Sequence, residues 1–310
     1  MIEHIIDTKQ LVAAWRRCRA NGGTAGVDGI NAEAFGQSLS RNLCRLAADV
    51  RTGRYQPGAL RTVPIPKPDG GTRILRIPCV RDRVLQGATS AVLVPGLDRK
   101  MSSSSFGYRP RRSVAMAIGA ARRGAGWTLD ADIRRFFDEV SHRSLRRALP
   151  DWIPCPETRR LITVWLRGFG RRGLAQGAPI SPLLANIALD DLDRAMRRNG
   201  RLHVRYADDF LTVCPTRVSA EQARRCAAKA LRPWGLSLHP EKTCIVPPQT
   251  EISFLGGTVM MKSANGQKGG VRLKPLKRND KKCSTANKRP ENQLRPTMFR
   301  LGWKIIRNLT

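Results

Sequence analysis

Two adjacent acids, Asp208 and Asp209, stand in the stretch Tyr206-Ala207-Asp208-Asp209, and a third candidate acid, Asp132, lies far upstream. Neighbouring carboxylates repel each other, and such a pair is tolerated mainly where a cation neutralises it. Hard oxygen ligands suit Mg²⁺. These residue types therefore point to divalent-metal chemistry, although an ordinary acidic turn is the simpler alternative.

The segments around these acids predict how they are positioned. Apolar, β-branched runs at 202–205 and 210–214 flank the acid pair, which indicates a β-hairpin with the acids at its tip. Residues 127–133 are strand-like and carry Asp130 and Asp132 at alternate positions, hence on one face. Acids on a half-buried strand bind a metal or pair with cations, and the nearby Arg134, Arg135 and Arg143 leave the second explanation open.

Residues 60–79 have a different character. Prolines exclude a helix, and Asp69-Gly70-Gly71 predicts a turn between two extended segments. Arg61, Lys67 and Arg73 are six residues apart, so a bent hairpin could direct all three cations at one polyphosphate. A solvated charged face is the alternative. The stretch 105–113 mixes aromatic residues with arginines, including Arg109, as nucleic-acid-binding surfaces do.

Helical periodicity and stop signals predict the remaining elements. We expect helices over 9–20, 31–51, 114–123, 156–169 and 219–234, and a long helix that starts after Gln176-Gly177 and ends near Arg198. Another helix opens near Arg81 and is expected to stop at Pro95-Gly96. Residues 235–243 form a turn and short strand that present Lys242, and residues 254–257 are expected on a further strand.

The composition is strongly basic. The 310 residues carry a formal net charge of +32, with a sequence pI near 11.3. Such an excess implies a polyanionic partner, most simply nucleic acid, because protein cations that neutralise phosphates release their counterions. The sequence shows no spanning apolar segment or secretory signal, and its cysteines are scattered without metal-ligand spacing. We therefore expect a cytoplasmic protein that does not associate with a membrane.

The order of these motifs from about Gly23 to Gly257 resembles the reverse transcriptase family, closest to the bacterial group II intron type. Ser181-Pro182 after Gln176-Gly177 favours that branch over the diversity-generating one. The resemblance implies an α+β fold of right-hand fingers and palm, with an antiparallel palm sheet packed on helices and a short or incomplete thumb. It places fingers over 1–100, palm over 101–258, and a basic tail or rudimentary thumb over 259–310.

The resemblance also assigns roles to single residues. Asp132, Asp208 and Asp209 resemble the catalytic, metal-binding aspartates of the palm. Phe137 resembles the aromatic gate beneath the nucleotide sugar. The residues that resemble further contacts of the incoming nucleotide are Arg61, Lys67, Arg73, Gln176 and Gly177. Those expected to contact nucleic acid are Arg109, Lys242 and Gly256.

These roles imply two-metal phosphoryl transfer to a primer 3′-hydroxyl, with two Mg²⁺ ions, or Mn²⁺ as a substitute, held by Asp132 and Asp208 with help from Asp209. The cations would offset charge on the triphosphate. The implied partners are an RNA template, a DNA or RNA primer, deoxynucleoside triphosphates, and an intron or other non-coding RNA. The +32 charge would hold the template–primer duplex.

The region after the palm matches a thumb poorly, so a truncated intron protein or a domesticated, defence-associated relative are alternatives. An RNA-binding maturase, a splicing cofactor that needs no polymerisation, is the second functional hypothesis. A nucleotide cyclase with a palm domain is disfavoured, because no Gly-Gly-Asp/Glu-Glu-Phe sequence occurs and a cyclase needs less positive charge.

Overall fold

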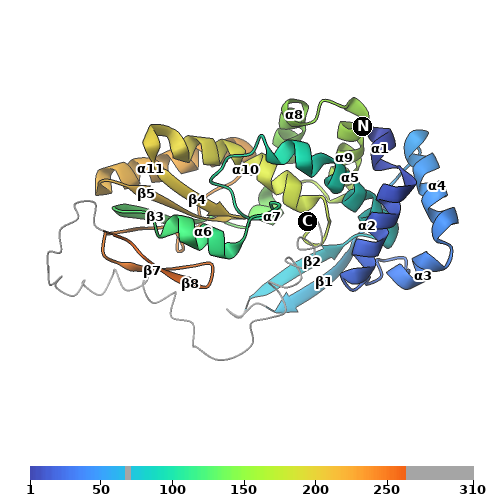
Figure 1. Cartoon of the computed structure of the whole chain (residues 1–310), viewed down its shortest axis with the longest axis horizontal. Helices are drawn as coiled ribbons and strands as arrows, with labels where there is room; N and C mark the ends of the chain where they lie inside the picture. The colour runs from blue at the N-terminus through green and yellow to red at the C-terminus, as the bar shows by residue number, and fades with distance from the viewer. Residues whose placement is uncertain (67–70, 263–310) are drawn as a thin grey trace. The chain divides into compact units, whose positions relative to one another are not determined.

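The computed structural model describes residues 1–66 and 71–262 (Figure 1). Within these residues the chain forms two compact units, each built from two segments of sequence. The first unit contains residues 1–101 and 135–188, and the second contains residues 102–134 and 189–262. Lys67 lies outside the described residues, as does most of the predicted basic tail.

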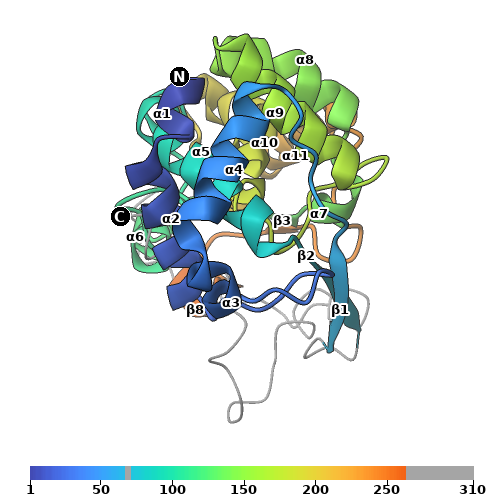
Figure 2. The same cartoon turned by 90° about the vertical axis from the view of Figure 1, so that its right-hand side faces the viewer.

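The first unit is helical, with one two-stranded sheet. Its elements are α1 (Ile2–Ile5), α2 (Thr8–Ala20), α3 (Ala32–Gln37), α4 (Leu39–Arg51), β1 (Arg61–Pro66), β2 (Thr72–Ile77), α5 (Val80–Asp98), α7 (Phe136–Glu139), α8 (His142–Trp152) and α9 (Pro156–Gly168). Helix α10 (Ser181–Arg197) begins in the first unit and ends in the second. Figure 2 shows α2, α4 and α5 alongside one another, with the β1–β2 hairpin below them.

The second unit is built on antiparallel strands. Its elements are α6 (Val114–Ala121), β3 (Trp127–Asp132), η1 (Arg198–Gly200), β4 (Leu202–Tyr206), β5 (Asp209–Cys214), α11 (Arg217–Leu231), η2 (Arg232–Trp234), β6 (Cys244–Val246), β7 (Glu251–Phe254) and β8 (Gly257–Met260). The main sheet has the strand order β4-β5-β3-β6, and every neighbouring pair is antiparallel. Strands β7 and β8 form a separate hairpin.

Amphipathic helices cover the main sheet. Helix α11 packs against β3, β5 and β6 through Ala220, Ala223 and Ala227, which recur at helical spacing. The other face of the sheet, with Leu211 and Val213, joins a buried cluster with α6 and the β7–β8 hairpin. This arrangement confirms the predicted α+β class with an antiparallel sheet packed on helices.

A chain of buried hydrogen bonds organises the core of the first unit. Trp165 Nε1 donates to the Tyr55 hydroxyl at 2.9 Å, and that hydroxyl donates to Asp82 Oδ1 at 2.7 Å. The Gly58 amide donates to the other Asp82 oxygen at 2.9 Å. Burial raises the pKa of Asp82. A buried carboxyl group needs hydrogen-bond partners, and Asp82 finds them on other elements. The hydrogen bonds thereby join α5, α9 and the loop before β1.

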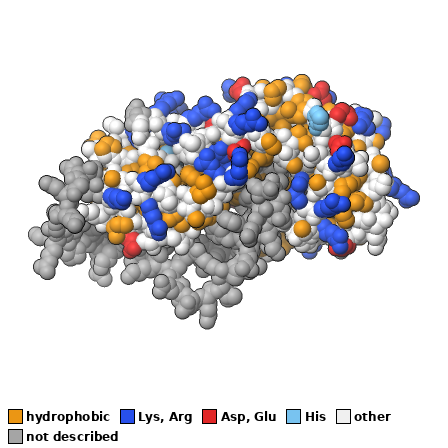
Figure 3. Space-filling model, in the orientation of Figure 1, with side chains coloured by type: hydrophobic (Ala, Val, Ile, Leu, Met, Phe, Trp, Pro, Cys, Tyr) orange, Lys and Arg blue, Asp and Glu red, His pale blue; other side chains and the backbone are white. Residues whose placement is uncertain are grey.

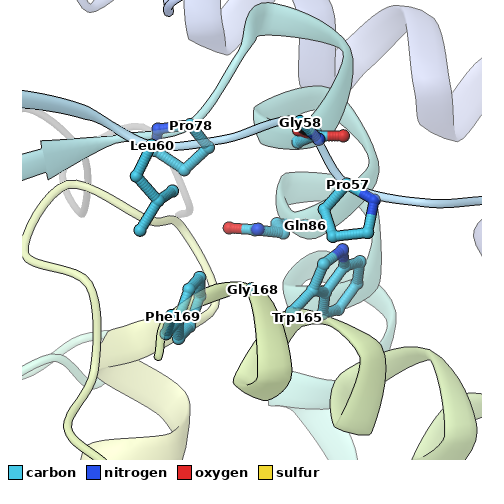
Figure 4. Close-up of a pocket in the computed structure, with 9 residues that line it drawn as sticks. Pro57, Gly58, Leu60, Pro78, Gln86, Trp165, Gly168 and Phe169 are labelled. Carbon is cyan, nitrogen blue, oxygen red and sulfur yellow. Dashed lines mark hydrogen bonds between the residues drawn. The ribbon is translucent and has the colours of Figure 1, made fainter. Parts of the chain in front are cut away.

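A hollow too small to admit a water molecule lies beside this chain, between Pro57, Leu60, Trp165 and Phe169 (Figure 4). The Gln86 side chain points into it, and its Oε1 has no hydrogen-bond partner within the described part of the chain. Ligand pockets usually exceed about 300 Å³ and contain several convergent polar groups. The hollow is therefore too small for a nucleotide and is not a candidate substrate site.

Three predicted boundaries are wrong. The helix expected over 31–51 is broken at Ser38 into α3 and α4. Pro95 does not stop α5, which continues to Asp98 with the proline in its last turn, where the missing N–H removes only one bond. The stretch expected on one strand at 254–257 is instead a tight hairpin, with Leu255 and Gly256 at φ +55° and +80° between β7 and β8.

Candidate active site

Asp132 and Asp209 face each other across two hydrogen-bonded strands. In the antiparallel pairing of β3 with β5, Asp132 is the direct register partner of Asp209, and Asp130 is the partner of Leu211. Directly opposed residues point to the same face, with Cβ atoms about 4.5–5.5 Å apart. Asp130, Asp132 and Asp209 therefore lie on one face of the sheet. The predicted encounter of Asp132 with the hairpin acids is present, but Asp209 rather than Asp208 is the residue directly opposite.

The hairpin tip is a two-residue turn. Tyr206 pairs with Asp209, which leaves Ala207 and Asp208 as the loop, and Ala207 has a left-handed φ of +58°. An L-residue in this conformation costs about 1–2 kcal/mol relative to the right-handed region. Gly107 lies directly beneath the turn, where an added Cβ would be 2.4 Å from the Ala207 nitrogen. The turn that carries Asp208 is thus held in a strained conformation by close backbone packing.

Arg205 anchors this turn from within the core. Its side chain is fully buried, and Nη1 donates to the Ala207 carbonyl at 2.9 Å. Nε and Nη2 bind the two Asp193 oxygens, each at 2.7 Å, in a bidentate pair between β4 and α10. Although burial acts to raise the pKa of Asp193, the charge and hydrogen bonds of Arg205, with His203, keep it below its usual range. The pair is therefore ionised and fixes the residue before the acid pair.

The carboxylates on the other face of the sheet repel one another. Desolvation and the charge of Asp132 raise the pKa of Asp130 to about 7. Desolvation, followed by the charges of Asp208, Asp132 and Asp130, raises the pKa of Asp209 to about 8, while Lys242 lowers it. The Asp209 residue is exposed, so solvent weakens the contribution of desolvation to its raised pKa. Repulsion by the neighbouring carboxylates is therefore the contribution to this pKa that we expect to remain. This cluster favours a bound cation.

Lys242 supplies one positive charge to this cluster. Its Nζ lies 3.4 Å from Asp132 Oδ2, and the Lys242 side chain is 53% exposed. The loop before it is tied to the end of β3, because the His239 amide donates to the Asp132 carbonyl at 2.8 Å and the Arg134 amide to the Ser237 carbonyl at 2.9 Å. Lys242 lies in a turn, as predicted, but the short strand expected within 235–243 begins only at Cys244, as β6. The partner of Lys242 is a candidate catalytic acid.

The acids do not yet form a closed metal site. Within residues 1–66 and 71–262, no three acidic, histidine or cysteine side chains converge closely enough to hold one ion as they stand. The donor chemistry nevertheless fits Mg²⁺, since several carboxylate oxygens share one face of the sheet and their like charges contribute to the raised pKa of Asp209.

The β1–β2 hairpin carries the predicted triphosphate-binding cations. The register pairs Arg61 with Ile77 and Arg73 with Ile65, so Arg61 and Arg73 project from the same face of the hairpin. Arg73 is exposed, whereas Arg61 Nη1 donates to the Ala25 carbonyl of the glycine-rich loop at 3.2 Å. The structure thus places two of the three cations on one surface.

Phe137, Gln176 and Gly177 also lie in the first unit. Phe137 is in the short helix α7, and its carbonyl accepts from the Leu174 amide at 2.6 Å. The Gln176 carbonyl accepts from the Arg76 amide of β2 at 2.9 Å. Gly177 has φ +120°, and a Cβ there would be 3.1 Å from the Arg76 carbonyl oxygen. The hairpin, α7 and the Gln176–Gly177 turn are therefore connected by backbone hydrogen bonds.

Two residues predicted to contact nucleic acid have structural roles within their own loops. Arg109 is 5% exposed, and its Nη1 donates to the Ser102 and Ser105 carbonyls at 2.5 and 3.1 Å. This position indicates that it orders its own loop. Gly256 lies at the left-handed corner of the β7–β8 hairpin. Their contacts with nucleic acid stay predictions.

Sequence reasoning missed Arg205 and Arg76, which bind backbone carbonyls around the candidate site residues. An arginine inside an apolar strand is the signal that could have found Arg205, because a buried charge needs a partner. Nothing in the sequence distinguishes Arg76 from the other basic residues of its hairpin.

Basic side chains are widespread on the molecule. Figure 3 shows many Lys and Arg side chains and few acidic ones on the face it presents. In the first unit, α8 buries Leu145 and Leu149 and exposes Arg143, Arg146 and Arg147. Among residues 1–66 and 71–262, no helix has the length and apolar character that crossing a membrane would require. The exposed arginines of α8 give the first unit a basic surface that suits a polyanionic partner.

Known proteins have sequences similar to that of this chain. The family model described as reverse transcriptase (RNA-dependent DNA polymerase) matches residues 65–259. Protein YkfC of Escherichia coli K12 is 30% identical over 294 residues, covering 77% of this chain and 76% of YkfC. The retron Mx65 reverse transcriptase of Myxococcus xanthus is 34% identical, covering 59% of this chain and 47% of that protein.

Group II intron proteins are also among the relatives, as the resemblance implied. The group II intron-encoded protein LtrA of Lactococcus lactis subsp. cremoris is 29% identical over 184 residues, covering 55% of this chain. This chain covers 30% of LtrA, and so corresponds to a part of that relative.

Solved structures show the same fold. The telomerase of Candida albicans, solved in complex with a fragment of telomeric RNA, superposes with a TM-score of 0.54 at 15% identity, covering 75% of this chain and 49% of the telomerase chain. The antiparallel sheet, the opposed aspartates and the matched family model lead to one conclusion: this chain belongs to the reverse transcriptase family of RNA-directed DNA polymerases.

Proposed function

We propose that this chain copies RNA into DNA, adding deoxynucleotides to the 3′-hydroxyl of a primer. The observation that carries the proposal is the register pairing of Asp132 with Asp209, with Asp208 in the adjoining two-residue turn. Two carboxylates on neighbouring strands and a third in the turn beside them would supply the hard oxygen donors that nucleotidyl transfer requires.

The residues that would hold two Mg²⁺ ions, or Mn²⁺ in their place, are Asp132, Asp208 and Asp209. When bound, such ions activate the primer hydroxyl and neutralise the leaving phosphates. Lys242 holds Asp132 in an ion pair, and Arg205 holds the backbone of the turn. The fold thereby fixes the backbone that presents these acids before any substrate arrives.

The nucleotide-binding roles belong to the first unit in this proposal. Arg61 and Arg73, which share a face of the hairpin, would offset charge on the triphosphate, together with Lys67. Gln176 and Gly177 would contact the nucleotide, and the ring of Phe137 would exclude a ribose 2′-hydroxyl. Replacing Phe137 with Ala is then expected to increase ribonucleotide incorporation.

The proposed partners are an RNA template, a DNA or RNA primer and deoxynucleoside triphosphates in the bacterial cytoplasm. Arg109, Lys242 and Gly256 stay proposed nucleic-acid contacts. The formal charge of +32 supports an extended polyanionic partner, since backbone phosphates can be neutralised without regard to sequence. Tighter binding at low ionic strength is the expected signature.

Primer extension on an RNA template with Mg²⁺ and deoxynucleotides tests the proposal. The wild-type chain should extend the primer, and Asp208→Ala should reduce extension by at least about 100-fold, the scale of losing one transition-state-stabilising group. Asp151→Ala, which removes an exposed acid of the first unit, is the matched control. Equal extension by wild type and Asp208→Ala would refute the proposed site.

A second candidate function is support of RNA splicing without polymerisation. The observation that favours it is the match to intron-encoded proteins together with the exposed arginines of α8. An Asp132→Asn/Asp208→Asn double variant separates the two functions. It should keep splicing support if the chain acts as an RNA-binding cofactor, and loss of that support would contradict this candidate.

A further inference from the structure

One half-buried arginine, Arg76, connects the three elements that carry the proposed nucleotide-binding residues. It lies on β2 and is the register partner of Thr62, so it projects from the hairpin face opposite to Arg61 and Arg73. Arg76 therefore cannot share the proposed triphosphate role of those two cations. Its guanidinium instead faces the body of the first unit.

The guanidinium binds two main-chain carbonyls of one irregular segment. Nη1 donates to the Phe169 carbonyl at 2.8 Å, and Nη2 donates to the Leu174 carbonyl at 3.1 Å. Residues 170–177 belong to neither a helix nor a strand, while Phe169 and Leu174 are buried. Buried carbonyls without regular secondary structure need another donor, and the planar fork of arginine can serve two at once.

Backbone bonds extend this connection on both sides. The Arg76 amide donates to the Gln176 carbonyl at 2.9 Å, which adds one bond of sheet type between β2 and the segment. The Leu174 amide donates to the Phe137 carbonyl at 2.6 Å, and the Gly173 amide donates to the Val140 carbonyl at 2.9 Å. Arg76 is thus linked directly to Gln176 by a hydrogen bond, and to Phe137 by two hydrogen bonds through Leu174.

The packing at the two glycines of the segment leaves little freedom. At Gly173, a Cβ would lie 2.6 Å from the Asp138 carbonyl oxygen, and at Gly177 it would lie 3.1 Å from that of Arg76. Both glycines have positive φ values, +83° and +120°. The segment follows this close path because glycine permits it and Arg76 holds it there.

We propose that Arg76 is a positioning residue for the incoming nucleotide, and that it sets the placement of Gln176 and Phe137 relative to Arg73. The inference rests on the proposed polymerase function. It concerns binding of the nucleotide rather than the chemical step, because Arg76 bonds only to protein carbonyls in the described structure. Loss of its guanidinium loosens the nucleotide-binding surface and leaves the opposed aspartates of the second unit in place.

Steady-state kinetics with a saturating RNA template–primer test this role. For Arg76→Ala, the KM for deoxynucleotides should rise about 10-fold or more, the scale expected for losing two charge-assisted hydrogen bonds. The kcat should stay within roughly 3-fold and the Kd for template–primer should be unchanged. Arg76→Lys keeps the charge but loses the fork, so its KM should lie between the two. Arg41→Ala, an exposed arginine of α4, is the control.

Hydrogen exchange gives a readout that does not depend on activity. In Arg76→Ala the amides of residues 76, 173 and 174 should exchange faster, whereas those of the β4–β5 hairpin should not change. Should Arg76→Ala fail to fold, Arg76→Lys carries both measurements. An unchanged KM in a folded variant, or a loss confined to kcat, overturns the inference. A wild-type chain that extends no primer overturns the proposed function instead.

Discussion

Asp132 on β3 and Asp209 on β5 are direct cross-strand partners, and their carboxylates share one face of the sheet with Asp130. This opposition of like charges is unfavourable in the absence of a cation. Desolvation, together with the charges of the neighbouring acids, raises the pKa values of Asp130 and Asp209, and this cluster determines how the protein should respond to mutation and to metal.

Replacing Asp209 with Asn should stabilise the metal-free protein while abolishing primer extension. The pKa of Asp209 is raised to about 8, so the folded state holds this proton more tightly than the unfolded state does. In EDTA, wild-type stability should therefore fall as pH rises from the ordinary aspartate range toward 8. The variant should show a smaller fall, because Asp130, whose pKa is also raised, keeps its own contribution. Thermal unfolding at pH 8 should show a Tm higher by roughly 2–4 °C. A lower Tm for the variant would contradict the charge-repulsion account.

The buried pair of Asp193 and Arg205 should be a major source of stability in the second unit. Asp193→Asn leaves the Arg205 guanidinium buried without its counter-charge, which typically costs about 3–5 kcal/mol. Urea denaturation measures this loss. Because the pKa of Asp193 is depressed, its contribution is present above the ordinary aspartate pKa and is lost only at lower pH. Asp151→Asn, at an exposed site, should change stability by less than about 0.5 kcal/mol.

Gly107 should be intolerant of a side chain because of its contact with the turn that carries Asp208. In Gly107→Ala the new Cβ would meet the Ala207 nitrogen at 2.4 Å, so the backbone carrying Asp208 must move. We expect a stability loss of about 1–3 kcal/mol and a kcat reduced by roughly 10-fold or more. Gly119→Ala is the matched control, since a Cβ there meets nothing within 4 Å and the residue is helical. Equal kcat values for the two variants would rule out the proposed strain on the turn.

His142 should make the first unit sensitive to acid. It is 5% exposed, its Nε2 lies 2.5 Å from the Gly173 carbonyl oxygen, and burial, followed by the charges of Arg146 and Arg76, lowers its pKa from 6.5. A depressed histidine pKa means that the unfolded state binds the proton more readily, so stability falls as pH drops below about 6.5. His142→Gln, which keeps an N–H donor, should flatten the dependence of Tm on pH between about 7.5 and 5.5. A steeper dependence in the variant would disprove the assignment.

The sequence predicted the elements that follow from local patterns. Two apolar runs, 202–205 and 210–214, predicted the β4–β5 hairpin, and alternation predicted β3, because both signals are contained within a few residues. The predicted tip held both Asp208 and Asp209, whereas Asp209 is the first residue of β5. The family and the α+β class followed from the order of such motifs. The strand register could not be predicted in this way. It pairs Asp132 with Asp209 rather than Asp208, and it depends on how two strands far apart in the sequence align, which local patterns do not specify.

Residues that act through tertiary contacts were beyond local reasoning. Arg76 and Arg109 have similar sequence neighbourhoods, rich in basic residues, yet one connects three elements and the other closes its own loop. Pro95 was expected to end α5, but the helix continues through it to Asp98. The catalytic and nucleotide-binding roles assigned by resemblance stay predictions until the variants above are measured.

Lys242 gives the protein its own resident counter-ion. With Nζ 3.4 Å from Asp132 and half of its side chain in solvent, the ammonium group neutralises this acid at little energetic cost and can leave as easily. On the proposed function, Asp132, Asp208 and Asp209 would hold the magnesium, which would take the place of the Lys242 ammonium beside Asp132. The freed lysine would then be available to the nucleic-acid backbone, so that metal binding and primer binding would strengthen each other.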